Sequence, residues 1–341
     1  MEYQGRYTAF DPSRIRTYPL GTRSNKVKLG DLFRPEDVEG LSLDVPQEVR
    51  RDIQAVAEAM VAARRQDKPV ILFTGAHLIK NGLGPLLLDL VERGCVTLVA
   101  GNGATTIHDF ELALIGETSE NVPAALDKGL FGMAYEFACI NTALSVGNEQ
   151  KLGYGESLGR TICDESFRRE VFARVSKAPS KFTHPEVSVL AACYRRGVPF
   201  TVHVGIGTDV IDQHPSFDGQ AKGGCSGRDF LLYTNEVAKL AEGGVVLNIG
   251  SAVTGPEVLL KAVSMASNVG RVPNGILTAD FDLRMHEPRQ MRDEAAPCYY
   301  FRDQKSVVTR IPEAFGGRGL YIQGDQKQTF PLLYKHIIEG L

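Results

Sequence analysis

Short apolar runs and amphipathic segments alternate along most of the chain. The first amphipathic segment, 45–65, carries its apolar residues on one face of a helix. An apolar run at 69–74 has the length of a buried strand, a helical pattern follows at 83–93, and a second buried strand follows at 96–100. Because a helix links these two strands, we expect them to lie side by side and parallel.

The alternation continues to the end of the chain. Residues 117–180 are expected to be mostly helical, whereas the glycine-rich segment 217–227 and the charged segment 281–303 are expected to be loops, the first of them mobile. Two short strands are predicted at 306–310 and 319–322. Other strands are predicted at 198–204, 245–248 and 274–280, and other helices at 184–197, 228–242 and 330–338.

This order of elements predicts an α/β protein. We expect a three-layer, Rossmann-like fold with a mainly parallel sheet and helices on both faces. Residues 1–44 are polar and irregular, so they are expected to form an N-terminal arm that packs on the body or on a neighbouring subunit. Residues 45–341 are expected to form a single domain that ends in a small C-terminal β appendage.

The run 96–115 is the first candidate for ligand binding. Its strand breaks at the glycine-containing turn 101–103 and continues as a helix, and the start of a helix aims free N–H groups at an anion. Acids such as Asp109 and Glu111 also occur at helix starts without any ligand. His108 is less well explained by helix chemistry, so we consider it the candidate proton carrier.

Polar residues in three further loops extend this candidate site. Ligands of open parallel sheets bind at the carboxyl ends of the strands, where these loops lie. Asp209 and Asp212 are three residues apart and are candidates to bind a ribose or an ammonium group, although a pair of Asx turns explains them equally well. The loops are 75–82, 205–212 and 249–257.

Composition excludes several classes of function. The chain has 341 residues, 43% of them hydrophobic, and a net charge of -3 with both signs mixed, which gives no sign of a nucleic-acid or membrane partner. The six cysteines are scattered without a C-x-x-C pair, and no apolar run has the length of a signal segment or a membrane span. We therefore expect a cytoplasmic protein with reduced thiols.

The order of elements and several motifs together resemble the deoxyhypusine synthase-like NAD-binding superfamily, over roughly residues 69–338. The turn 101–102 and the helical segment 108–111 are similar to a motif of the NAD-dependent ornithine cyclodeaminase branch. Motifs similar to those of the synthases lie at 75–82, 208–209, 278–279 and 293–295.

The resemblance implies that NAD is the cofactor and that the protein assembles as a homodimer or homotetramer. The synthases have a catalytic lysine where this chain has Tyr300, so the chain departs from them and is nearer to the cyclodeaminase branch. By position, the resemblance implies that NAD contacts Ala76, His77, Gly101, Asn102, Asp209, Gly250, Ser251, Thr278 and Ala279.

The leading hypothesis is an NAD-dependent enzyme that acts on a C–N bond of an amine or basic amino acid through an imine. His108 would move the proton, and the acids Asp109, Asp212, Asp293 and Glu294 would hold the substrate ammonium group.

Two other functions stay open. One is a non-catalytic NAD-binding or assembly protein, which the missing lysine favours. The other is a metal-assisted hydrolase that uses His203, Asp209, Asp212 and His214, although their spacing fits no zinc pattern.

Overall fold

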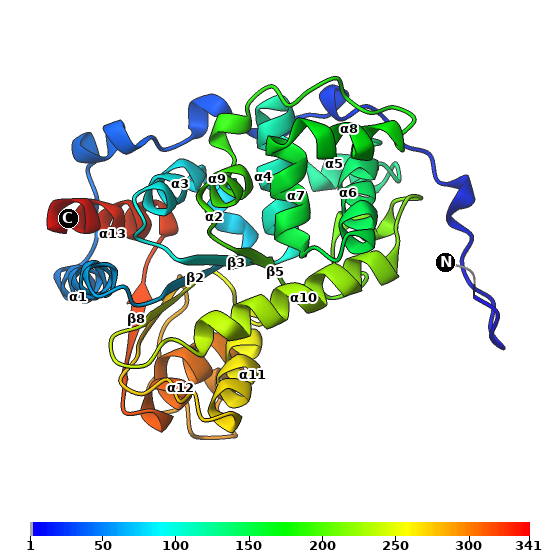
Figure 1. Ribbon diagram of the computed structural model, residues 1–341. Helices are drawn as coiled ribbons and strands as arrows, with labels where there is room; N and C mark the ends of the chain where they lie inside the picture. Colours follow the sequence, from blue (N-terminus) through cyan, green and yellow to red (C-terminus); the bar gives the residue numbers. More distant parts are fainter. Residues whose placement is uncertain (1–2) are drawn as a thin grey trace.

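The chain folds around a parallel sheet with helices on both faces (Figure 1). The computed structural model describes residues 3–341, and within them the main sheet has six strands in the order β5-β3-β2-β6-β7-β8, each parallel to its neighbours. The predicted fold class is therefore confirmed. The strands are β2 (Val70–Thr74), β3 (Leu98–Gly101), β5 (Phe200–Val202), β6 (Val245–Ile249), β7 (Leu277–Asp282) and β8 (Arg318–Gln323).

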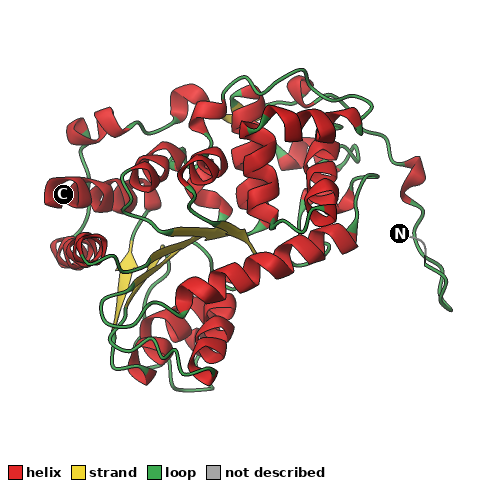
Figure 2. Ribbon diagram, viewed as in Figure 1, coloured by secondary structure: helices red, strands yellow, loops and turns green. Residues whose placement is uncertain are grey.

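Figure 2 shows the sheet between two layers of helices. One face is covered by α1 (Gln47–Arg65), α3 (Gly84–Glu92), α9 (Val189–Arg196) and α13 (Gln326–Gly340), and the other by α10 (Gly219–Val237), α11 (Thr254–Asn268) and α12 (Ile311–Ala314). The remaining α-helices are α2 (Ala76–Lys80), α4 (Gly103–Ile115), α5 (Val122–Leu126), α6 (Phe137–Glu149), α7 (Tyr154–Cys163) and α8 (Glu165–Ala173). None of the helices within residues 3–341 is both long and apolar enough to cross a membrane.

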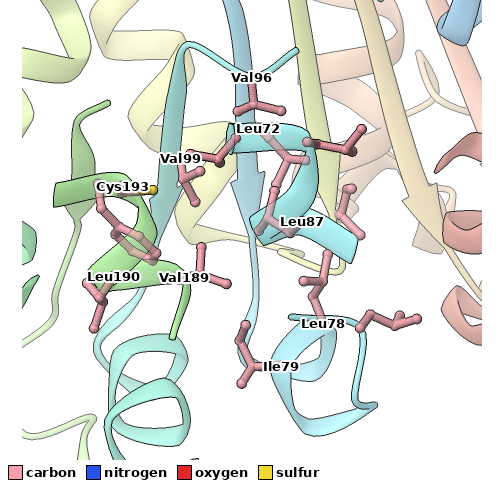
Figure 3. Close-up of a cluster of buried hydrophobic side chains, with 14 of the residues drawn as sticks. Leu72, Leu78, Ile79, Leu87, Val96, Val99, Val189, Leu190 and Cys193 are labelled. Atoms are coloured by element: carbon pink, nitrogen blue, oxygen red, sulfur yellow. The ribbon is translucent and has the colours of Figure 1, made fainter. Parts of the chain in front are cut away.

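Strand β2 is buried along its whole length because helices cover both faces of the sheet. Its residues alternate between the two hydrophobic cores, with Leu72 in one and Phe73 in the other. Figure 3 shows Leu72 near Leu87 of α3 and Val99 of β3, in a core that also includes Leu190 of α9. The apolar run that predicted a strand therefore lies between the two hydrophobic cores.

The order of the strands in the sheet marks where a ligand can bind. Numbered along the chain, the sheet strands lie in the spatial order 3-2-1-4-5-6, which is the order of dinucleotide-binding Rossmann folds. The connections leave β2 and β6 toward opposite halves of the sheet. In such sheets the ligand crevice lies beyond the carboxyl ends of these two strands.

Three details of the predicted elements are wrong. The segment 217–227 is not a loop: Asp218 caps α10, which begins at Gly219. The segment 306–310 is not a strand. It lies in the π-helix η8 (Gln304–Arg310), which packs on the sheet. The second strand predicted for the C-terminal appendage, 319–322, lies within β8, which is the edge strand of the main sheet. The segments 306–310 and 319–322 therefore do not form a separate β appendage.

The N-terminal arm is only partly packed on the body. Strand β1 (Asn25–Lys28) pairs antiparallel with β4 (Glu117–Glu120), which fixes the second half of the arm. Residues 3–14 extend away from the body and are exposed, including Phe10 at 82% (Figure 1). Residues 1 and 2 of the predicted arm lie outside the described part of the chain.

Candidate active site

Two glycines bring the backbones after β2 and β6 into contact at the switch in strand order. The N–H of Gly75 donates to the carbonyl of Ile249 at 2.9 Å. A Cβ added to Gly75 would lie 2.2 Å from the carbonyl oxygen of Gly250, so no other residue fits without separating the loops. Gly250 itself has a φ of +63°, which glycine adopts most readily.

A cavity of about 260 Å³ lies next to α4. Helix α2, helix α4, strand β4 and the loop after β5 all contribute to its walls, so it lies at the carboxyl end of the sheet. We call it the α4 cavity. Its charged and titratable lining residues are Arg23, Lys80, His108, Glu111, Glu120 and Asp209.

His108 is oriented in the α4 cavity by a chain of hydrogen bonds. Its Nδ1 lies 2.6 Å from Oγ1 of Thr118, and that hydroxyl donates to Oε2 of Glu111 at 2.5 Å. The Thr118 hydroxyl has one proton and donates it to the Glu111 carboxylate. Nδ1 of His108 must therefore be protonated and donate to the Thr118 oxygen. The neutral imidazole then has an unprotonated Nε2, which is the form of a general base.

Glu111 is the charged end of this chain. Its carboxylate is buried and forms an ion pair with Arg23, with 2.6 Å between Nη2 and Oε1. Burial alone would raise the pKa of Glu111, but hydrogen bonding to His108 and the charge of Arg23 outweigh it, so the pKa is lowered. Glu111 therefore stays ionised at the end of this chain of hydrogen bonds.

One cation of the α4 cavity forms no ion pair with the described residues. Lys80 is half-buried in the cavity wall, and none of the described carboxylates lies within 4.0 Å of its ammonium group. His77 lies one helical turn away, and partial desolvation of its ring and the charge of Lys80 lower its pKa. Since Arg23 already pairs with Glu111, Lys80 is the cation left for an anionic group.

Asp109, a predicted catalytic residue, has a structural role instead. Its carboxylate accepts hydrogen bonds from the hydroxyl of Ser188 at 2.5 Å and from the N–H groups of Val189 and Leu190. These donors form the start of α9. Asp109 points away from the α4 cavity and does not line it.

Asp209 and Asp212 both form ion pairs with Lys222. Nζ of Lys222 lies 2.7 Å from Asp209 and 2.5 Å from Asp212, and all three side chains are buried. Asp209 also fills the start of α4, because a Cβ on Gly103 would lie 2.1 Å from its carboxylate. The anion that the sequence predicts at this helix start is therefore the chain's own Asp209.

The other predicted cofactor residues divide into two groups. Thr278 and Ala279 are fully buried in the first half of β7, before the carboxyl edge of the sheet. The rest follow the carboxyl ends of strands, where Oδ1 of Asn102 caps α4 and Oγ of Ser251 accepts from the start of α11. They are Ala76, His77, Gly101, Asn102, Gly250 and Ser251.

Asp293 and Glu294 lie outside the α4 cavity. Both are exposed in the loop after β7, where Asp293 accepts from the N–H of Ala295 and Glu294 accepts from the hydroxyl of Tyr299. Tyr300, where the resembled synthases have a lysine, is 63% exposed. Asp293 and Glu294 therefore do not line the α4 cavity with His108.

The residues proposed for a metal-assisted hydrolase do not form a site. His203 packs against the rings of Phe73 and Tyr233, and burial lowers its pKa to about 3. His214 is bonded to Ser216, and the two aspartates bind Lys222. Within the described chain, this set gives no cluster of metal ligands.

Sequence reasoning missed most of the groups around His108. Glu111 is three residues beyond His108, a spacing that places both on one face of a helix, and this signal was available. Arg23 and Thr118 reach the site through the β1–β4 pairing, which no local pattern indicates.

Comparisons with known proteins concern the fold. No protein-family model and no curated protein matches the chain. Among solved structures, the cyanobacterial arginine dihydrolase ArgZ is 16% identical with a TM-score of 0.47, over 85% of this chain and 33% of its own. AgrE in complex with ornithine and NAD+ is 15% identical with a TM-score of 0.47, over 88% of this chain and 34% of its own.

The predicted superfamily is represented among these similar structures. A putative deoxyhypusine synthase from Entamoeba histolytica is 9% identical with a TM-score of 0.42, over 85% of this chain and 89% of its own. The chain spans about a third of the length of ArgZ and AgrE. Likeness of this degree does not extend to function.

Proposed function

We propose that the protein is an NAD-dependent enzyme that acts on a C–N bond of an amino acid bound in the α4 cavity. One observation carries the proposal: a histidine in the form of a general base lines a cavity at the carboxyl end of a sheet with the Rossmann strand order. The strand order fits a dinucleotide, which in Rossmann folds lies across the carboxyl ends of the strands at such a switch.

The chain's own residues account for the proton chemistry. NAD, when bound, supplies the hydride acceptor for oxidation of a carbon that bears nitrogen. A substrate ammonium group must lose a proton before that oxidation, and Nε2 of His108 is the base that takes it. Glu111, acting through Thr118, offsets the charge that His108 then carries.

The charges in the α4 cavity favour an amino acid over a simple amine. Each acid that lines it already pairs with a cation of the chain: Glu111 and Glu120 with Arg23, and Asp209 with Lys222. Lys80 is the unpaired charge among the described lining residues, and an ammonium group of the chain attracts a carboxylate. We therefore propose that the substrate carboxylate binds Lys80.

Turnover by a His108→Gln variant tests the proposal. We expect NAD and basic amino acids to give reduced nicotinamide or a deaminated product, and the variant to lose roughly 10²–10⁴-fold in kcat with an unchanged melting temperature. The matched control is His336→Gln, since His336 pairs with Glu339 three residues away on the surface of α13. Equal activity of wild type and His108→Gln would contradict the role of His108.

A second variant separates the two substrate classes. Lys80→Met should raise KM for an amino acid and leave KM for the matching decarboxylated amine unchanged. Tight nucleotide binding without turnover of any amino acid or amine would favour the non-catalytic NAD-binding alternative.

A further inference from the structure

Three carboxylates meet at the carboxyl end of β7, outside the α4 cavity. Asp280 and Asp282 lie two residues apart in the strand, so both point to the same face of the sheet. Asp303 joins them from the start of η8, which follows the long loop after β7. One oxygen atom from each carboxylate lies within 4.8 Å of the others.

The charges in this cluster are not balanced. Asp280 and Asp303 are buried, at 0% and 1% exposed. Among the described residues, Arg284 is the cation that forms ion pairs with the cluster, and it contacts Asp282 and Asp303 but not Asp280. Three carboxylates therefore share one guanidinium group, and burial of unpaired charge is costly.

Asp280 also has an oxygen atom without a partner. Its Oδ1 accepts a hydrogen bond from Nδ2 of Asn248 at 2.7 Å, whereas its Oδ2 is buried and has no hydrogen-bond donor. Buried acceptors in folded proteins almost always have a partner. Because Asn248 donates to Oδ1, Oδ2 is the oxygen of Asp280 that has no partner in the described chain.

We propose that Asp280, Asp282 and Asp303 bind one divalent cation, Mg²⁺ or Ca²⁺. Carboxylate oxygens without nitrogen or sulfur donors suit these hard ions. The ion supplies the missing positive charge, gives Oδ2 of Asp280 a partner and joins β7 to the end of the loop that precedes η8. Arg284, whose guanidinium group lies 4.6 Å from the ring centre of Phe301, is the chain's own competitor for the site.

Calorimetric titration of the chelator-treated full chain with MgCl₂ and CaCl₂ tests the proposal. We expect one saturable site for at least one ion, and roughly tenfold or more weaker binding in Asp282→Asn, which loses a charged ligand. Glu287→Gln is the matched control, because Glu287 is an exposed acid of the same loop. Arg284→Gln removes a competing positive charge and should bind the ion roughly threefold to tenfold more tightly.

Hydrogen exchange of the wild-type protein gives an independent readout if a variant fails to fold. The bound ion should slow exchange within 283–303 and leave the helices on the opposite face unchanged. Absence of saturable binding of either ion in both wild type and Arg284→Gln would overturn the proposal. Unchanged affinity in a folded Asp282→Asn variant would overturn it as well.

Discussion

Replacement of Lys222 by methionine is expected to destabilise the protein strongly. The ammonium group of Lys222 is the counter-charge of both Asp209 and Asp212, and each of the three side chains is at most 5% exposed. Methionine fills much of the same volume but leaves two buried carboxylates without a cation. Removal of one partner of a buried ion pair costs about 3–5 kcal/mol. Over 341 residues, this corresponds to a fall of roughly 4–7 °C in melting temperature.

Scanning calorimetry at neutral pH measures this effect. The control is Lys261→Met, because Lys261 pairs with Glu257 at the surface, and its loss should lower the melting temperature by less than about 1.5 °C. Adding Asp209→Asn and Asp212→Asn to Lys222→Met removes the uncompensated charges and should restore most of the stability. If Lys222→Met melts within about 1.5 °C of wild type, the two aspartates are not held by this lysine.

Two further predictions concern pH and the switch in strand order. Burial raises the pKa of Asp229 from 3.8 to about 8 against hydrogen bonds from backbone N–H groups. Its stabilising contribution is therefore complete below about pH 4 and is lost as pH rises through about 8, so the melting temperature of wild type should fall over this range more than that of Asp229→Asn. Gly75→Ala pushes a Cβ against the carbonyl of Gly250 and should weaken NAD binding at least tenfold by calorimetry, whereas Gly223→Ala, where a Cβ meets nothing within 4 Å, should bind NAD normally. Equal NAD affinity of the two glycine variants would count against a cofactor site at Gly75.

The strands of the sheet were predictable because a parallel sheet covered on both faces leaves continuous apolar runs such as 70–74. Their spatial order was not, because it depends on contacts between segments far apart in the chain. The start of α10 was missed because glycines between 219 and 227 indicate a loop, while its buried face and its Asp218 cap form a helix. The π-helix at 304–310 was missed because its β-branched residues are typical of strands.

The candidate site was predictable only in part. His108 stands out in the sequence, but Asp109 points to α9 and Glu111 is its real acidic partner. The acidic pair Asp209 and Asp212 looked available for a ligand because Lys222 lies more than one helical turn further along the chain. Burial of that lysine against them depends on tertiary packing, which local sequence does not reveal.

Hydrogen exchange with and without NAD tests the central claim most directly. The account predicts that saturating NAD slows exchange in the segments 75–82 and 250–257, which follow the two strands on either side of the switch in strand order. Absence of NAD binding, or protection confined to the groove between α1 and α13, would contradict it.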